Sequence, residues 1–164
     1  MTRVRQHGFT IVELLIVIVV IGILAAITIV AFNGVQARAN NTTIQSDLRS
    51  AGKQIELHKL GAGDGSYPAN TDSSLAQVNF KLSKNSYSTE SGNFLYCTTS
   101  DYSSFALVSQ STSGAIYSYV NGSISSYTAH TSMGSYAAMC NNLLGSNYPR
   151  FGYTAGAWRA WAAA

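Results

Sequence analysis

The sequence predicts an α+β fold, in which one long N-terminal helix precedes a small antiparallel sheet. Residues 9–32 form an apolar run whose single charged residue is Glu13, and apolar residues then recur at helical spacing as far as Ile55. Four short runs rich in aromatic and β-branched residues follow between 93 and 127. Because a helix buries its apolar face, we expect the sheet to lie against the outer half of the helix.

The apolar run is long enough to cross a membrane. Its 24 residues span about 36 Å as a helix, whereas the hydrocarbon core of a bilayer is about 30 Å thick. A cleaved secretory signal has an apolar core of only about 7–15 residues, with the cleavage site on its far side, so the run does not fit one. Arg3 and Arg5 stand before the run and favour a cytoplasmic location for that end.

Glu13 lies inside this run and needs a partner. An acidic residue at mid-bilayer costs about 3 kcal/mol on insertion scales, although Glu13 is only about 6 Å along a helix from Phe9 and so close to the cytoplasmic headgroups. An ionisable residue in a membrane segment indicates a function with a partner group. We find no such group in the apolar run and expect it from a second molecule or from a new amine at the start of the segment. An incidental interfacial carboxylate is the alternative.

The residues around Glu13 resemble a known family. A short basic leader, residues 1–8, precedes the string Gly8-Phe9-Thr10-Ile11-Val12-Glu13-Leu14-Leu15, and Gly22-Ile23-Leu24-Ala25-Ala26-Ile27 follows it. This pattern resembles the prepilin signature of type IV pilins and type II secretion pseudopilins. The resemblance implies cleavage between Gly8 and Phe9 by a membrane aspartyl prepilin peptidase, and N-methylation of the new Phe9 amine. It also implies that Glu13 neutralises the Phe9 amine of an adjacent subunit in a filament.

One departure from the family concerns the helix itself. Many members carry a proline shortly after the Ala-Ala-Ile run, but this chain has Val30 there. We therefore expect any softening of the helix to lie later, at 33–34 or 40–43, where weak helix formers stand. A helix over 9–60 has 52 residues and a length of about 78 Å. Its amphipathic stripe in the outer half consists of Ile44, Leu48, Ala51 and Ile55.

We divide the chain into four segments: a leader at 1–8, a transmembrane or filament-core helix at 9–32, its amphipathic continuation at 33–60, and an extracellular globular domain at 61–164. In the globular domain we expect a loop at 61–92, a sheet at about 93–127 and a C-terminal region at 128–164. Asp72 is the expected cap of a short helix in the loop. The predicted strands are 93–99, 105–110, 115–120 and 123–127, with Asn121-Gly122 as a hairpin turn. The resemblance implies the same arrangement, the ladle architecture of pilins.

The two cysteines, Cys97 and Cys140, both lie in the globular domain. They lack metal-ligand spacing, and in an extracellular domain such a pair favours one disulfide. By the chain-entropy model, closing a loop of about 44 residues contributes roughly 4 kcal/mol to the free energy of unfolding. Two buried free thiols are the alternative.

No catalytic site is predicted, because no Gly-x-Ser-x-Gly nucleophile motif occurs and the histidines lie on unrelated segments: His7, His58 and His130. A net charge of +3 is too small to indicate nucleic-acid binding, and the sequence neither predicts nor excludes nucleic acid as a partner. Asp64, Asp72 and Asp101 could contribute oxygen ligands for calcium, but the spacing of an EF-hand is absent. We therefore expect no enzyme, no metal site and no cofactor.

The C-terminal tail offers one candidate recognition surface. Trp158, Arg159 and Trp161 place two indoles and a guanidinium close together in the sequence, a combination suited to stacking on sugars or bases. The alternative, which we favour, is that both tryptophans cover the sheet or a neighbouring subunit.

These observations predict a structural subunit, which we interpret as the major pilin of a type IV pilus used for adhesion, motility or DNA uptake. The expected partners are identical subunits in a helical filament, the prepilin peptidase and, indirectly, the assembly platform and its ATPases. The expected location is the inner, cytoplasmic membrane before assembly and an extracellular pilus afterwards. One alternative is a pseudopilin of a type II secretion or competence system. An alternative of another class is a monomeric, membrane-anchored surface binding protein.

Overall fold

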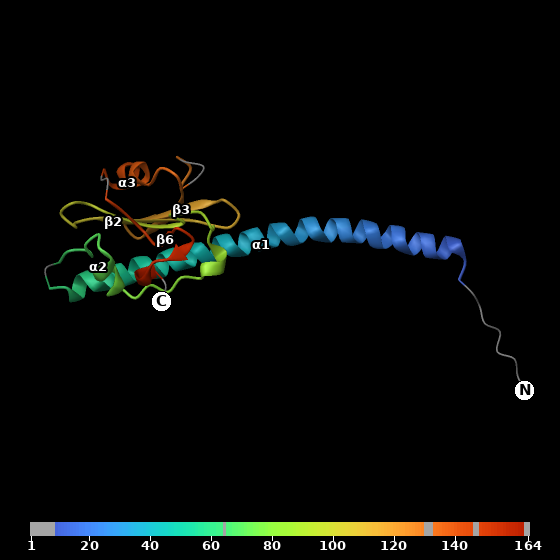
Figure 1. Ribbon diagram of the computed structural model, residues 1–164, viewed down its shortest axis with the longest axis horizontal. Coiled ribbons are helices and arrows are strands. Elements are labelled where there is room, and N and C mark those ends of the chain that lie inside the picture. Colours follow the sequence, from blue (N-terminus) through green and yellow to red (C-terminus); the bar gives the residue numbers. More distant parts are fainter. Residues whose placement is uncertain (1–8, 64, 130–132, 146–147, 163–164) are drawn as a thin grey trace, which may run out of the picture. The chain divides into compact units, whose positions relative to one another are not determined.

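The computed structural model describes residues 9–63, 65–129, 133–145 and 148–162. The predicted leader with Gly8, and also Asp64 and His130, lie outside the described residues. The chain divides into two units, Met1–Gln36 and Ala37–Ala164, which we describe separately. Figure 1 shows the chain coloured along its sequence, with several of its helices and strands labelled.

In the first unit, residues 11–36 belong to helix α1, which runs from Ile11 to Gly61 where the sequence predicted 9–60. The helix has no break at 33–34 or 40–43, the two places where softening was expected. At the second place the hydroxyls of Thr42 and Thr43 donate hydrogen bonds back to the carbonyls of Arg38 and Ala39. These bonds satisfy both hydroxyls without interrupting the helix.

The second unit is built on a five-stranded antiparallel sheet with the order β4-β3-β2-β1-β5. The fold is therefore α+β, as predicted. The Asn121-Gly122 turn between β3 and β4 has positive φ angles of 50° and 81°, which a two-residue hairpin loop of the primed type requires. The strands are β1 (Phe94–Thr98), β2 (Phe105–Gln110), β3 (Ile116–Val120), β4 (Ser123–Ser126) and β5 (Pro149–Phe151). The first four begin and end within one residue of the predicted strands, whereas β5 was not predicted.

Helices cover both faces of this sheet (Figure 1): the outer half of α1 lies on one face and α3 (Tyr136–Leu144) on the other. Alternate residues of β1 therefore enter different cores, with Phe94 and Tyr96 facing α1 and Leu95 and Cys97 facing α3. The predicted stripe of α1 is buried against the first of these faces at Ile44, Leu48, Ala51 and Ile55.

The C-terminal region returns from the α3 face to the α1 face. After β5 pairs with β1, a small hairpin of β6 (Tyr153–Thr154) and β7 (Ala157–Trp158) leads to a 3₁₀ helix, η2 (Ala160–Ala162). Two short helices lie between α1 and β1. They are the α-helix α2 (Asp72–Ala76) and the 3₁₀ helix η1 (Lys84–Ser86). The N-cap of α2 is Thr71, whose hydroxyl accepts a hydrogen bond from the backbone of Ser74, so the prediction that Asp72 is the cap was wrong by one residue.

Candidate functional site

The start of α1 is closed by a reciprocal pair of side chains, Thr10 and Glu13. The backbone N–H and the hydroxyl of Thr10 donate to Oε2 of Glu13 over 2.9 and 2.7 Å, and the backbone N–H of Glu13 donates to the Thr10 hydroxyl oxygen over 3.2 Å. Since α1 begins at Ile11, Thr10 is the N-cap residue and Glu13 the third residue of the helix, which is the geometry of a capping box.

The capping box corrects the expectation that the apolar run offers Glu13 no partner. The signal was present in the sequence, because Thr-x-x-Glu immediately before an apolar run is the pattern of a capping box.

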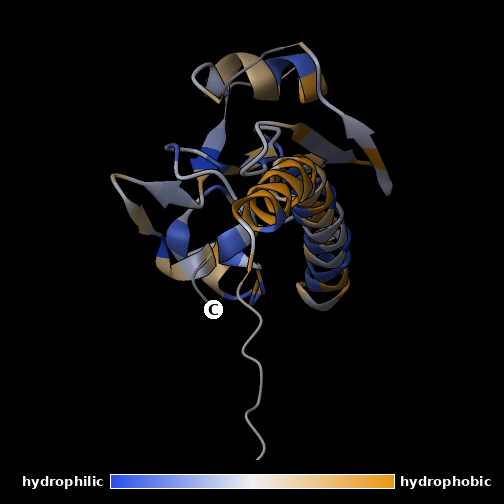
Figure 2. Cartoon of the chain, turned by 90° about the vertical axis from the view of Figure 1, so that its right-hand side faces the viewer, coloured by the Kyte–Doolittle hydropathy of each residue, from blue (hydrophilic) through white to orange (hydrophobic). Residues whose placement is uncertain are grey.

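The apolar residues beyond Glu13 have no cover. Throughout the described part of the first unit every residue is exposed, beginning with Phe9 at 85%. In Figure 2 this part of α1 is coloured almost wholly as hydrophobic. By length and composition alone α1 could cross a membrane. A helix that is apolar on all sides is stable only when lipid or other protein surrounds it.

Small residues interrupt this apolar surface at Gly22 and Ala26, four positions apart on one side of the helix. A Cβ atom built on Gly22 would meet nothing within 4 Å. Small residues let another helix approach closely, so this side of α1 has room for a neighbour.

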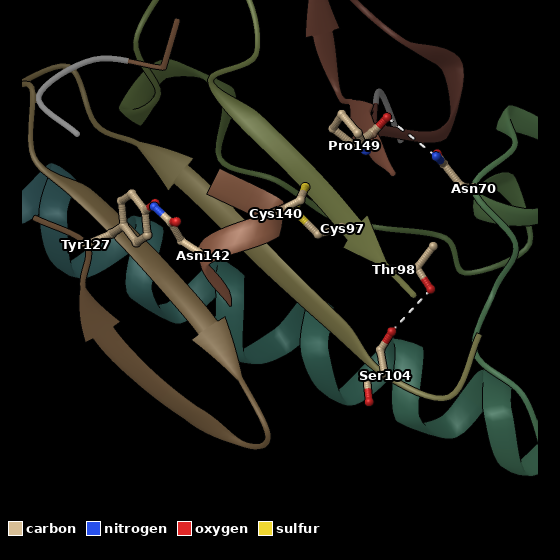
Figure 3. The surroundings of a disulfide bond; sticks show 8 residues. All are labelled: Asn70, Cys97, Thr98, Ser104, Tyr127, Cys140, Asn142 and Pro149. Carbon is tan, nitrogen blue, oxygen red and sulfur yellow. Dashed lines mark hydrogen bonds between the residues drawn. A yellow bond between two sulfur atoms is a disulfide. The ribbon is translucent and has the colours of Figure 1, made fainter. Parts of the chain in front are cut away.

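A disulfide joins the two predicted cysteines, Cys97 of β1 and Cys140 of α3, with a Cα–Cα distance of 5.4 Å (Figure 3). Both residues are fully buried. Close to it, the Asn142 side chain of α3 donates a hydrogen bond to the Tyr127 hydroxyl over 3.2 Å. The disulfide therefore attaches α3 to the face of the sheet that α1 leaves free.

The proposed recognition surface at the C-terminus does not form as a group. Trp161 is only 1% exposed and packs against Phe80 and Phe94, with ring centroids 5.5 and 5.9 Å away. The prediction of Trp161 as a surface residue was therefore wrong, because its large apolar ring fills the core under the sheet.

Its two partners in that prediction lie nearer the surface. Trp158 is half-buried between Tyr87 and Tyr153, at 5.3 and 5.4 Å between ring centroids. Arg159 is exposed, and its Nε donates a hydrogen bond to the Thr154 hydroxyl over 3.1 Å. Both tryptophans thus cover the sheet, which is the alternative that the sequence analysis favoured.

The aspartates considered for calcium have other partners where they are described. The Asp72 carboxylate forms a two-point ion pair with Arg150, at 2.9 Å to Nε and 2.8 Å to Nη2. Hydrogen bonds from Thr99 and Ser103 lower the pKa of Asp101 to about 2. Within the described ranges, which exclude Asp64, no three His, Cys, Asp or Glu side chains gather in one place.

Together these features define a class: α+β proteins of pilin-like architecture, with an exposed apolar N-terminal helix that carries a glutamate at its third position. Residues 3–29 match the prokaryotic N-terminal methylation motif. Among similar proteins, the type IV wide pilus major component PilA4 of Thermus thermophilus is 39% identical over 66 residues, which are 40% of this chain and 49% of that protein.

Two further relatives are type II secretion system core proteins G. That of Dickeya chrysanthemi is 34% identical over 56 residues, 34% of this chain and 37% of the relative. That of Aeromonas hydrophila is 32% identical over 79 residues, 48% of this chain and 54% of the relative. The chain thus spans between 37% and 54% of the length of these three relatives. No solved structure matches.

The motif and these relatives confirm the resemblance to type IV pilins and type II secretion pseudopilins. Proteins of this family are structural and non-enzymatic, which is the class that the sequence analysis predicted. The relatives are divided between a pilin and secretion-system proteins, so they do not decide between these two roles.

Proposed function

We propose that the protein is the major subunit of a type IV pilus, which assembles with identical copies through residues 9–60. The single observation that carries this proposal is the N-terminal segment that is exposed throughout 9–36 and that, over 9–32, is apolar around the helix with Glu13 as its one charged residue. Such a surface is covered by lipid before assembly and by the helices of other copies afterwards. The second unit, Ala37–Ala164, here called the globular unit, has its own buried core and does not need this surface to fold.

Processing would precede assembly. A prepilin peptidase would cut between Gly8 and Phe9, remove the leader at 1–8, and leave a Phe9 amine for N-methylation; the methylation motif at 3–29 supports this step. The new cationic amine would pair with Glu13 of a neighbouring subunit. Since two opposite charges must repay their desolvation, the pair would set the register of the subunits more than it would stabilise the filament.

The location follows from these steps. The subunit would be held in the inner membrane by 9–32, with its continuation at 33–60 and the globular domain at 61–164 outside the cytoplasm. An assembly platform and its ATPases would then move it into an extracellular pilus on the cell surface. Adhesion, motility or DNA uptake would depend on the filament surface.

The second candidate is a pseudopilin of a type II secretion system, which the similarity to core protein G favours. A pseudopilin would use the same residues at 8–13 but form a short fibre inside the cell envelope. Negative-stain microscopy of material sheared from cells separates the two roles. We expect long filaments that contain this chain, and their absence from cells that still secrete through such a system would contradict the pilus assignment.

The decisive test of assembly combines mass spectrometry with a Glu13→Ala variant. We expect an N-terminus at methylated Phe9 in the native protein, and for Glu13→Ala a loss of filaments while the protein stays in the membrane. Glu90→Ala, which removes an exposed carboxylate of the globular unit, is the control and should leave filaments intact. An intact Met1, or full function of Glu13→Ala, would favour a monomeric membrane-anchored protein.

A further inference from the structure

We infer that Thr10 is a positioning residue that holds the Glu13 carboxylate ready for the amine of a second copy of this chain. The inference rests on the proposed function, because it concerns how that pairing is prepared. It starts from the capping box at the beginning of α1, which binds Glu13 within its own chain.

The Thr10 contacts engage only one oxygen of the carboxylate. Both donors of Thr10, its backbone N–H and its hydroxyl, converge on Oε2 of Glu13. Among the described residues no hydrogen bond to Oε1 occurs, and a carboxylate has about four acceptor positions. Glu13 can therefore stay bound to Thr10 and still accept a further donor at Oε1.

The capping box does not depend on the leader. All of its atoms belong to Thr10 and Glu13, which lie on the C-terminal side of the proposed cut between Gly8 and Phe9. The same contacts can therefore form before and after cleavage. The new Phe9 amine would arise next to Thr10, at the same end of the helix toward which the capping box directs the carboxylate.

Two consequences follow for a subunit stored in a membrane. First, Thr10 satisfies a polar group that would otherwise enter an apolar environment without a partner. Second, the hydrogen bonds fix the rotamer of Glu13 in advance, which lowers the entropy lost when a second copy arrives. Without the Thr10 hydroxyl, only the backbone N–H of Thr10 would hold the carboxylate, and the rest of its ordering would fall at the moment of assembly.

The test compares Thr10→Val, which removes the hydroxyl at nearly constant volume, with Thr10→Ser, which keeps it. Thr28→Val is the matched control, because Thr28 lies on the same exposed helix and its hydroxyl donates to the Ala25 carbonyl and not to a side chain of the described residues. In the full chain in detergent, amide hydrogen exchange at Glu13 should become about fivefold faster in Thr10→Val, the effect of losing a typical N-cap. Thr10→Ser and Thr28→Val should leave it unchanged.

The second readout is the yield of sheared filaments relative to processed subunit, measured with the N-terminus by mass spectrometry. We expect Thr10→Val to be cleaved and methylated but to give several-fold fewer filaments, and Thr10→Ser to restore the yield. Unchanged exchange, or faster exchange with a normal yield, would overturn the positioning role. A Thr10→Val chain that keeps Met1 would overturn it in favour of a role in cleavage. Failure of the pairing itself would appear separately, as filaments formed by Glu13→Ala.

Discussion

The Tyr87 hydroxyl donates a hydrogen bond to the Asp47 carboxylate of α1 over 3.0 Å. The same carboxylate accepts the backbone N–H of Ser83 over 2.7 Å and the Ser83 hydroxyl over 3.2 Å. Tyr87 is only 2% exposed, and its burial, together with the charge of Asp47, raises its pKa far above the usual range. The phenol therefore remains protonated and able to donate, and Asp47 fastens the segment before β1 to the helix.

Tyr87→Phe should lower the free energy of unfolding by about 2 kcal/mol, because a buried hydrogen bond to a charged group is lost while the ring remains. Thermal unfolding of the full chain in detergent, followed by near-ultraviolet circular dichroism, measures this change. Tyr148→Phe is the control, since Tyr148 is 51% exposed and its substitution should change stability little. Equal effects of the two substitutions would contradict the role given to Asp47.

Gly52 permits the close approach of α1 to β3. A Cβ atom at this position would overlap the ring of Tyr119, whose hydroxyl donates a hydrogen bond to Glu56 of the same helix over 2.8 Å. Gly52→Ala should therefore lower the free energy of unfolding by about 2 kcal/mol, because overpacking outweighs the gain of about 1 kcal/mol in helix propensity.

The control for Gly52 is Gly34→Ala in the same helix, where a Cβ atom meets nothing within 4 Å. Alanine there should leave stability unchanged or raise it slightly. Thermal unfolding of both variants compares a crowded and an open position at one helix. If both gained stability, the contact between Gly52 and Tyr119 would not limit the packing of α1.

Most of the central fold could be predicted from the sequence, because its elements have strong periodic patterns. The stripe that includes Ile44 and Leu48 predicted a buried helix face, and aromatic and β-branched runs predicted β1 to β4. The cysteine pair also predicted its own disulfide. In each case the local pattern agrees with the tertiary environment, so the residues alone are informative.

The C-terminal region could not be predicted for a physical reason. The strand Pro149–Phe151 has only three residues and exists because it pairs with β1, a partner far away in the sequence. Trp161 likewise reaches the core only because the hairpin of β6 and β7 turns the chain back toward the α1 face. At the candidate site, the capping box of Thr10 and Glu13 could have been predicted, since its pattern is local.

Stability should fall at alkaline pH because of buried tyrosines. Burial and the hydrogen bond to Glu56 raise the pKa of Tyr119 to about 12, whereas an unfolded tyrosine titrates near pH 10. The folded state therefore holds this proton more tightly than the unfolded state. The contribution of Tyr119 to folding stability is complete below about pH 10 and is lost as the pH rises toward 12. Burial raises the pKa of Tyr96 in the same direction.

We accordingly expect the unfolding temperature to decline between about pH 10 and 12, and more gently in Tyr119→Phe, which loses one titrating group. Thermal unfolding in a series of buffers measures both slopes. A Tyr119→Phe slope identical to that of the unsubstituted protein would show that Tyr119 does not contribute to the alkaline transition.

The disulfide should be a major source of stability for the globular unit. Cys97 and Cys140 are 43 positions apart, and the chain-entropy model gives about 4 kcal/mol for closing a loop of this size. Cys97→Ala combined with Cys140→Ala should lower the free energy of unfolding by about this amount. Limited proteolysis should then cut first near α3, which the disulfide attaches to the sheet. Because the double variant has no disulfide to reduce, a reductant should not change its stability. A further loss of stability on adding reductant would show an effect unrelated to this bond.

Substitutions of Trp158 and Trp161 test whether the C-terminal tail is part of the core or a recognition surface. Trp161→Ala should lower the free energy of unfolding by about 3–5 kcal/mol, because it empties a buried site between Phe80 and Phe94. Trp158→Ala should cost less, since that ring is half-buried. Trp161→Phe keeps an aromatic ring in the core and should recover part of the loss. If Trp161→Ala folded with normal stability but reduced the binding of filaments to surfaces, the tail would be a recognition site after all, and the core packing described for it would be in error.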